Sequence, residues 1–295
     1  MTREEEEELI NLTEIGQIVS FLMNNQANED FDGYSPTEME YILYEPFIKE
    51  SPVQFCENIP DELLDQVPML KMVEYLMDKI EEAGELKLTK TGALPRNIVL
   101  DLYGRYIKDE AVERFHYKVS KETDSISVQA AHISLVVSKL IRKRNNKISL
   151  TRLGKSLKTN RRELFINVFT AYGQRFNLAF FDGYESQIVG NLGFAFSLIL
   201  LSKFGEEKLQ TSFYSDKYGK AFPEVLKDFG HSYSTPKKEM ERCYARRTFH
   251  NFFNLFNLIE IEETPSWDEP DLVKKSAIFD HIFRIIPSNA SGKMN

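Results

Sequence analysis

The stretch RKRNNKISLTRLG, residues 142–154, combines turn, strand and helix-cap chemistry within a short span. Arg144–Asn146 holds the Asn-Asn pair that is typical of a tight turn between two strands. Lys147–Leu150 (KISL) alternates polar and apolar residues, which predicts a strand, and Thr151 suits the cap of a following helix. The stretch therefore predicts a short β-hairpin that leads directly into a helix.

Two other parts of the chain follow the same order of elements. One helix is expected to end at Gly84, before ELKLTKTG, and another near Asn257, before LIEIEE, a loop and LVKKSAIF. In each copy a helix precedes a short β segment, and a small hydroxyl residue opens the next helix. These hydroxyl residues are Thr89, Thr151 and Ser276. A two-stranded ribbon cannot bury both of its faces, so we expect each ribbon to fold back on its own helices.

Apolar residues elsewhere recur at three- and four-residue steps, which predicts helices for most of the chain. The expected helices cover about 4–22, 36–45, 68–83, 95–107, 109–119, 127–141, 161–180, 186–204, 206–217, 223–229 and 236–256. We therefore expect a mainly α protein with winged-helix-like modules, short β-hairpin wings and a helical C-terminal half. An N-terminal helical segment (1–58) precedes two such modules (59–160), and a helical domain (161–295) contains a third, degenerate wing at about 236–286.

Two sequence segments carry a resemblance to known families. Leu150, Thr151 and Gly154 form an L-T-x-x-G segment, which resembles the end of the wing in winged-helix transcription regulators. GYSPTEMEYILYEPF (33–47) and LKLTKTGALP (86–95) resemble a group of uncharacterised bacterial proteins with G-x-SP-x-x-M…LY-x-PF and LKLT-x-x-G-x-LP segments. Related segments occur in a plasmid-borne open-reading-frame family, and the likeness covers about residues 31–160. The resemblance implies winged-helix-like modules and carries over no catalytic residues.

Composition indicates a globular protein of the reducing cytoplasm. The 295 residues include 42% apolar and 28% charged residues, and the net charge is −8. Cys56 and Cys243 lie far apart and do not suggest a disulfide framework. The N-terminus, MTREEEEELI, is acidic and unlike a secretory signal. The most apolar run, Gly193–Ser202, is too short to span a bilayer, so we expect a buried helix there, no membrane partner and a cytoplasmic location.

Positive charge is concentrated in one part of this acidic chain. Lys139–Arg162 contains ten Lys or Arg residues and no Asp or Glu. Such a run suits contacts with phosphate groups, and the wing and the preceding helix of a winged helix both face a duplex. The predicted nucleic-acid-binding residues are Gln129, His132, Lys139, Arg142, Lys143, Arg144, Lys147, Arg152, Lys155, Lys158, Arg161 and Arg162. The leading hypothesis is a non-enzymatic DNA-binding or regulatory protein, in which Arg142–Arg144 and Lys147 neutralise the backbone and the helix from Ser127 lies near a groove.

Two other interpretations of the basic run remain open. In the first, the modules build a protein-interaction scaffold without nucleic-acid binding, with the acidic segment Glu4–Glu8 as counter-charge in the same chain or from a second copy. Alternatively, the basic run is a solvated face. Double-stranded DNA is thus one expected partner, and a protein or a second copy of the chain is the other.

Motifs for catalysis, metals and cofactors are incomplete. Asn28–Gly33 (NEDFDG) resembles the start of a calcium loop, but Met39 occupies the position of the bidentate Glu. GHSYS (230–234) lacks the last Gly of a nucleophile elbow. The five histidines show no metal-ligand spacing, and no phosphate-cradling glycine loop occurs. We therefore expect no catalytic residues, no metal, no cofactor and no enzymatic activity.

Overall fold

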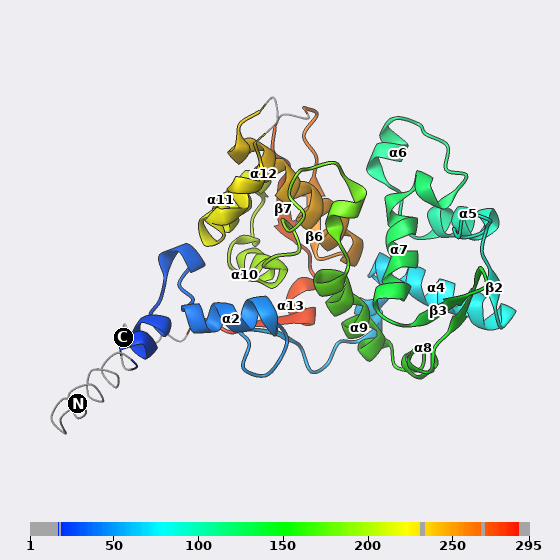
Figure 1. Ribbon diagram of the computed structural model, residues 1–295, viewed down its shortest axis with the longest axis horizontal. Helices are drawn as coiled ribbons and strands as arrows, with labels where there is room; N and C mark the ends of the chain where they lie inside the picture. The colour runs from blue at the N-terminus through cyan, green and yellow to red at the C-terminus, as the bar shows by residue number, and fades with distance from the viewer. Residues whose placement is uncertain (1–16, 18, 231–233, 267–268, 289–295) are drawn as a thin grey trace, which may run out of the picture.

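The computed structural model of the protein is mainly helical, with short antiparallel strands in three small sheets (Figure 1). It describes residues 17, 19–230, 234–266 and 269–288. The mainly α class with small β-hairpins that the sequence predicts is confirmed. The acidic segment Glu4–Glu8 and most of the first expected helix lie outside the described residues.

One helical unit occupies one end of the molecule and contains the hairpin predicted from RKRNNKISL (Figure 1). In chain order its elements are α4 (Pro68–Ala83), β2 (Leu86–Lys87), α5 (Arg96–Arg105), α6 (Glu110–Arg114), η2 (Glu122–Asp124), α7 (Ile126–Val137), β3 (Ile141–Arg144) and β4 (Lys147–Leu150). The three strands form one sheet in the order β2-β4-β3.

The expectation of separate ribbons after Gly84 and near Ile141 therefore differs from the structure. β2 pairs with β4, so both β segments belong to one sheet rather than to two ribbons. The physical reason is that the β3–β4 hairpin leaves one edge of β4 open, and a two-residue strand gains its only ladder partner there.

A second unit repeats the same succession of elements. Its elements are α10 (Phe194–Phe204), β5 (Leu209–Gln210), α11 (Thr211–Ala221), η4 (Pro223–Asp228), α12 (Pro236–Tyr244), the π-helix η5 (Ala245–Phe253), the 3-10 helix η6 (Asn254–Phe256), β6 (Ile259–Glu262) and β7 (Leu272–Lys275). Its sheet order, β5-β7-β6, again places the first strand beside the last. The sequence predicted β6 and β7 but not β5, which gives the second sheet the same strand order as the first.

The remaining elements join and surround the two units. They are η1 (Glu29–Phe31), α2 (Pro36–Tyr44), β1 (Val53–Phe55), α3 (Asp61–Leu64), α8 (Arg152–Leu157), α9 (Arg161–Arg175), η3 (Leu178–Phe181), α13 (Phe279–Ile282) and β8 (Phe283–Ile285). β1 pairs with β8 in antiparallel register, with Val53 opposite Ile285. This pairing brings the early and late parts of the chain together.

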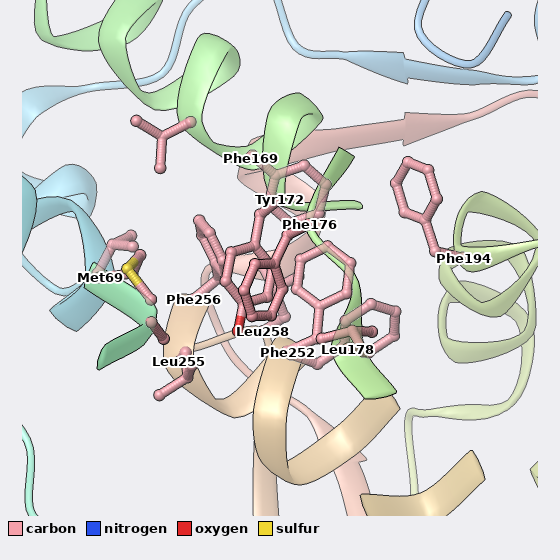
Figure 2. Packing of buried hydrophobic residues seen from close by; sticks show 14 of the residues in the cluster. Met69, Phe169, Tyr172, Phe176, Leu178, Phe194, Phe252, Leu255, Phe256 and Leu258 are labelled. Atoms are coloured by element: carbon pink, nitrogen blue, oxygen red, sulfur yellow. The ribbon is translucent and has the colours of Figure 1, made fainter. Parts of the chain in front are cut away.

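An aromatic cluster connects α9 to the second unit and to the β1–β8 pair (Figure 2). The ring of Phe169 lies 5.1 Å from that of Phe252, 5.0 Å from that of Phe256 and 5.1 Å from that of Phe283. The hydroxyl of Tyr172 is buried and donates to the carbonyl oxygen of Asn251. These rings belong to the hydrophobic core of the protein.

Local sequence signals explain several element boundaries. A capping box fixes the start of α2, because the Ser35 hydroxyl accepts from Glu38 N and the Glu38 carboxylate accepts from Ser35 N. The expected helix over 186–204 is shorter, since α10 begins after Gly193, which has φ 64° and packs against the ring of Phe222. Asp32 of the NEDFDG segment forms ion pairs with Lys203 and Lys217.

Candidate nucleic-acid interface

A tight turn fixes the shape of the basic hairpin. Asn145 and Asn146 have φ values of 49° and 57°, the left-handed conformation that a two-residue turn between twisted strands requires. The Asn146 side-chain amide donates to the carbonyl oxygens of Leu88 and Thr89, at 3.2 Å and 2.6 Å. The turn is therefore fastened to the loop that follows β2.

The register of the sheet places cations in a row on its outer face. Lys147 lies opposite Lys87 on one side and opposite Arg144 on the other. Arg142 lies two positions before Arg144, so it faces the same way. Ile148, on the alternate face of β4, is 1% exposed and packs into the core. The alternation of the strands therefore separates an apolar inner face from a basic outer face.

Six of the predicted residues are exposed cations for which the described structure contains no carboxylate partner. They are Lys139, Arg142, Lys143, Arg144, Arg152 and Lys155. Arg142 Nε donates to the hydroxyl of Ser149 at 3.1 Å, which holds its side chain along the sheet. Lys143, at the hairpin tip, has its Nζ 3.5 Å from the Gly92 carbonyl oxygen.

Lys147 is also exposed but has one surface counter-charge. Its Nζ lies 2.9 Å from the Glu85 carboxylate, and both side chains are about half exposed. The hydrogen bond and charge of Lys147 lower the pKa of Glu85 below its usual value. Solvent screens exposed pairs of this kind and leaves them little stabilisation, so a phosphate group can compete for Lys147.

The last three basic residues of the predicted strip serve the fold instead. Arg161 binds Glu74 through two hydrogen bonds, of 2.7 Å and 3.2 Å, and Asp65 at 2.9 Å. These bonds, to Glu74 first, raise the pKa of Arg161. Lys158 pairs with Asp78 and Glu81 of α4. In this way the cations fix α8 and α9 against the acidic face of α4.

Arg162 also has partners within the protein. One of its guanidinium nitrogens lies 2.7 Å from Glu163, and the other donates to the carbonyl oxygen of Cys56 at 2.9 Å. Together with Lys158 and Arg161, it lies outside the set of cations that face solvent without a partner.

The two uncharged candidates and their helix are largely covered. His132 is 8% exposed, and its Nδ1 lies 2.8 Å from Glu122. Gln129 is half-buried, and Val136 is the exposed apolar residue of α7. The helix packs against α4, α5 and α9. Buried residues occupy most of the circumference of α7, and the position of this helix near a groove stays a prediction.

The structure adds two cations that the sequence analysis missed. Lys87 joins the row on the outer face, and Lys90 is exposed in the loop after β2. They lie far from the basic run in sequence, and only the pairing of β2 with β4 brings them beside it. We define the basic wing by the exposed cations at and around this sheet: Lys87, Lys90, Lys139, Arg142, Lys143, Arg144, Lys147, Arg152 and Lys155.

The corresponding sheet of the second unit carries charges of both signs. Glu260 and Glu262 of β6 alternate with apolar residues, Lys274 of β7 lies opposite Glu260, and Lys208 pairs with Glu262. Mixed charges of this kind do not build the concentrated positive potential that attracts polyanions. Of the two repeated sheets, the one with the basic wing is therefore the candidate for phosphate contacts.

Thr151 and Gly154 connect the hairpin to α8. The Thr151 hydroxyl accepts from the Gly154 N–H at 3.0 Å and donates to the Lys139 carbonyl oxygen at 2.8 Å. A Cβ atom on Gly154 would overlap the backbone carbonyl group of Leu140. The L-T-x-x-G pattern therefore reflects a helix start that packs directly on the backbone at the beginning of β3.

Gly154→Ala is expected to destabilise the protein by about 1–3 kcal/mol, because the added methyl group meets backbone rather than a mobile side chain. Gly104→Ala is the matched control, since Gly104 lies in α5 with open space around it. There, higher helix propensity should stabilise by up to about 1 kcal/mol. Chemical denaturation of both variants checks this prediction, and equal stability of the two would contradict it.

The comparisons with known proteins give one match. Residues 65–163 are similar to the Y4jL N-terminal domain, a family of uncharacterised proteins. The matched part runs from the start of α4 into α9, so it contains the unit with the basic wing. The expected likeness to uncharacterised proteins is confirmed at that level. Searches of curated proteins and of solved structures return no match.

Two further properties concern the described residues alone. Among them, no helix has the length and apolar character needed to cross a membrane. The same residues contain no group of three or more His, Cys, Asp or Glu side chains arranged to hold a metal ion.

Proposed function

We propose that the protein binds double-stranded DNA through the basic wing, in contact with the phosphate backbone and without catalysing a reaction. The observation that carries the proposal is the row Lys87–Lys147–Arg144 with Arg142 beside it, on one exposed face of a three-stranded sheet. Phosphate contacts by Lys and Arg supply most of the affinity of non-specific duplex binding. A regulatory role is the expected setting for such binding.

We further infer that both repeated units are winged-helix modules. The order helix, strand, helix, helix, strand, strand, with the first strand paired to the last, supports this inference. In winged helices that read DNA sequence, the helix before the hairpin enters the major groove. Here α7 is packed against α4, α5 and α9, so the proposed contacts are with the backbone and depend little on base sequence.

The salt dependence of duplex binding tests the proposal. Five phosphate contacts would give a slope of about −4.5 in a plot of log K against log salt concentration. The triple variant Arg142→Glu, Arg144→Glu, Lys147→Glu should reduce the magnitude of that slope by about 2.7, because three contacts are lost. Its affinity at moderate salt should fall at least about tenfold, measured by fluorescence anisotropy.

A matched control separates local contacts from net charge. The control is a second triple variant that changes the same amount of charge at exposed positions outside the basic wing. Its substitutions are Lys49→Glu, Lys220→Glu and Arg284→Glu. This control should retain most of the affinity. Equal losses for both triple variants, or no loss for the wing variant, would refute backbone binding at this face.

A protein-interaction scaffold is the second candidate, and the burial of α7 favours it. A winged helix whose groove-reading helix is covered by α9 retains its sheet and wing as surfaces for another protein. In that case the wing variant should change the oligomeric state or the capture of a partner, while duplex binding is absent for the native protein as well. Analytical ultracentrifugation of the native and variant proteins distinguishes the two candidates.

A further inference from the structure

A cavity of about 460 Å³ lies in the second unit, remote in sequence from the basic wing. Its wall is formed by the start of α11, the inner side of α12 and η5, and the segment that leads into β7. Cavities of roughly 300–1,000 Å³ are the usual size for small-molecule sites. The residues that matter for its chemistry are Thr211, Ser212, Arg246, Glu269 and Tyr184.

The N-terminus of α11 presents unused hydrogen-bond donors to the cavity. Gln210, at the cap position, makes no side-chain capping bond, and the N–H groups of Ser212 and Phe213 have no acceptor in the described structure. Thr211 lines the cavity and is 2% exposed, and its hydroxyl likewise has no partner. Helix N-termini favour anions because their free N–H groups and dipole carry partial positive charge.

Arg246 supplies a full positive charge at the same cavity. It lies four residues after Arg242 and four before His250, and all three line the wall. Among the described residues, Arg242 pairs with the Glu239 carboxylate at 3.1 Å, and His250 pairs with the Asp271 carboxylate at 2.9 Å. Arg246 has no carboxylate partner among these residues. The π-helical winding of η5 begins at Ala245, directly before it, and such segments occur frequently at functional sites.

Most of the carboxylates around the cavity are already occupied. Burial acts to raise the pKa of Asp271, but hydrogen bonds from His250 and from the Thr264 N–H outweigh it and hold that pKa below its usual value. Glu239 is held by Arg242 and Glu241 by Lys237. The carboxylate of Glu269 lines the wall and has no partner among the described residues, so it can accept hydrogen bonds from a bound molecule.

We propose that this cavity binds a small organic phosphate that carries hydroxyl groups. The phosphate lies at the start of α11, where the two free N–H groups, the Thr211 hydroxyl and Arg246 supply donors for its three terminal oxygens. Glu269 accepts from the hydroxyl groups, and Tyr184 lines the same wall. The site is independent of the basic wing, and either proposal can fail without the other.

Thermal unfolding and calorimetry with defined probes test the site in the full-length protein. Ribose 5-phosphate should raise the midpoint of unfolding, whereas ribose without phosphate should not. Inorganic phosphate should bind more weakly, since it lacks the contacts with Glu269. Adenosine monophosphate in a parallel titration distinguishes a nucleotide from a sugar phosphate. No shift with any phosphate probe up to about 10 mM would overturn the proposal.

Three single variants place the binding within the cavity. Thr211→Val removes only the hydroxyl, and Arg246→Gln removes only the charge, so each should weaken ribose 5-phosphate binding by about tenfold or more. Lys220→Gln removes an exposed cation from α11 outside the cavity wall and should bind like the native protein. If Arg246→Gln fails to fold, Thr211→Val decides alone, because the substitution keeps the shape. Native affinity in Thr211→Val, or an equal loss in Lys220→Gln, would overturn the site.

Discussion

Replacement of Arg247 by methionine is expected to lower the free energy of unfolding by about 3–5 kcal/mol. Arg247 is fully buried, and its guanidinium group binds both carboxylate oxygens of Asp182 at 2.7 Å and 2.8 Å. It also donates to the carbonyl oxygens of Ser186 and Val189. Methionine leaves the mostly buried Asp182 carboxylate without a counter-charge and two carbonyl groups without donors. Burial of these unpaired groups is what destabilises the folded state when one partner of a buried pair is removed.

Denaturant titration of Arg247→Met measures this effect. Arg284→Met, at an exposed position of β8, is the control and should change stability by less than about 0.5 kcal/mol. The double variant Arg247→Met, Asp182→Leu should recover part of the loss, because it removes the stranded carboxylate. A loss below about 1 kcal/mol in the single variant would show that the pair contributes little to the packing of 182–190 on η5.

Much of the fold was predictable where the signal is local. The Asn-Asn turn and the alternation in KISL predicted the β3–β4 hairpin, and the Thr151 cap predicted the start of α8. Gly84 ends α4 as expected, in a left-handed conformation with φ 66°. Each of these features depends on residues within a few positions of one another, which is the range over which propensity and capping act.

Other parts of the fold depend on contacts that no local pattern reports. β1 pairs with β8 across most of the length of the chain, and the sequence analysis placed no strand at Val53–Phe55. β2 belongs to the β4 sheet because of the open edge of the hairpin, not because of its own residues. The expected helix over 236–256 is continuous but changes to π winding at Ala245, which its composition does not indicate.

The candidate site, too, was predictable where it depends on neighbouring residues and not where it depends on distant contacts. The charge run predicted the exposed cations of the hairpin, such as Arg142 and Arg144, because strand alternation settles their direction. It also included Lys158 and Arg161, whose acidic partners lie about 80 residues earlier in α3 and α4. Counting charges cannot separate a cation that faces solvent from one that pairs across the fold. The domain boundaries and the cytoplasmic location stay predictions.

The different charges of the two repeated sheets bear on the proposed function. The second sheet mixes Glu260 and Glu262 with Lys274, so we expect the proposed duplex contact to be confined to the unit with the basic wing. A short footprint and moderate affinity follow, since few phosphates are neutralised by one hairpin. The expected slope is therefore near −4.5, smaller in magnitude than that of proteins that wrap DNA.

Phe169→Ala is expected to destabilise the protein by about 3–5 kcal/mol and to affect both units together. Phe169 is fully buried, and its ring contacts rings from β1, β8, α10, η5 and η6 as well as from its own helix. Removal of this ring leaves a cavity bordered by elements that come from distant parts of the chain. Neighbouring rings cannot collapse into it without shifting the β1–β8 pair, so little of the cost is recovered.

Phe180→Ala provides the control, because Phe180 is 62% exposed and its loss should change stability by less than about 1 kcal/mol. Hydrogen exchange adds a sharper measurement. If Phe169 joins the units, amide protection in Phe169→Ala should fall by a similar factor in α4 and in α10. A loss of protection in one unit alone would contradict this, and would mean that each unit is stabilised by its own helices and that the aromatic cluster serves only the second.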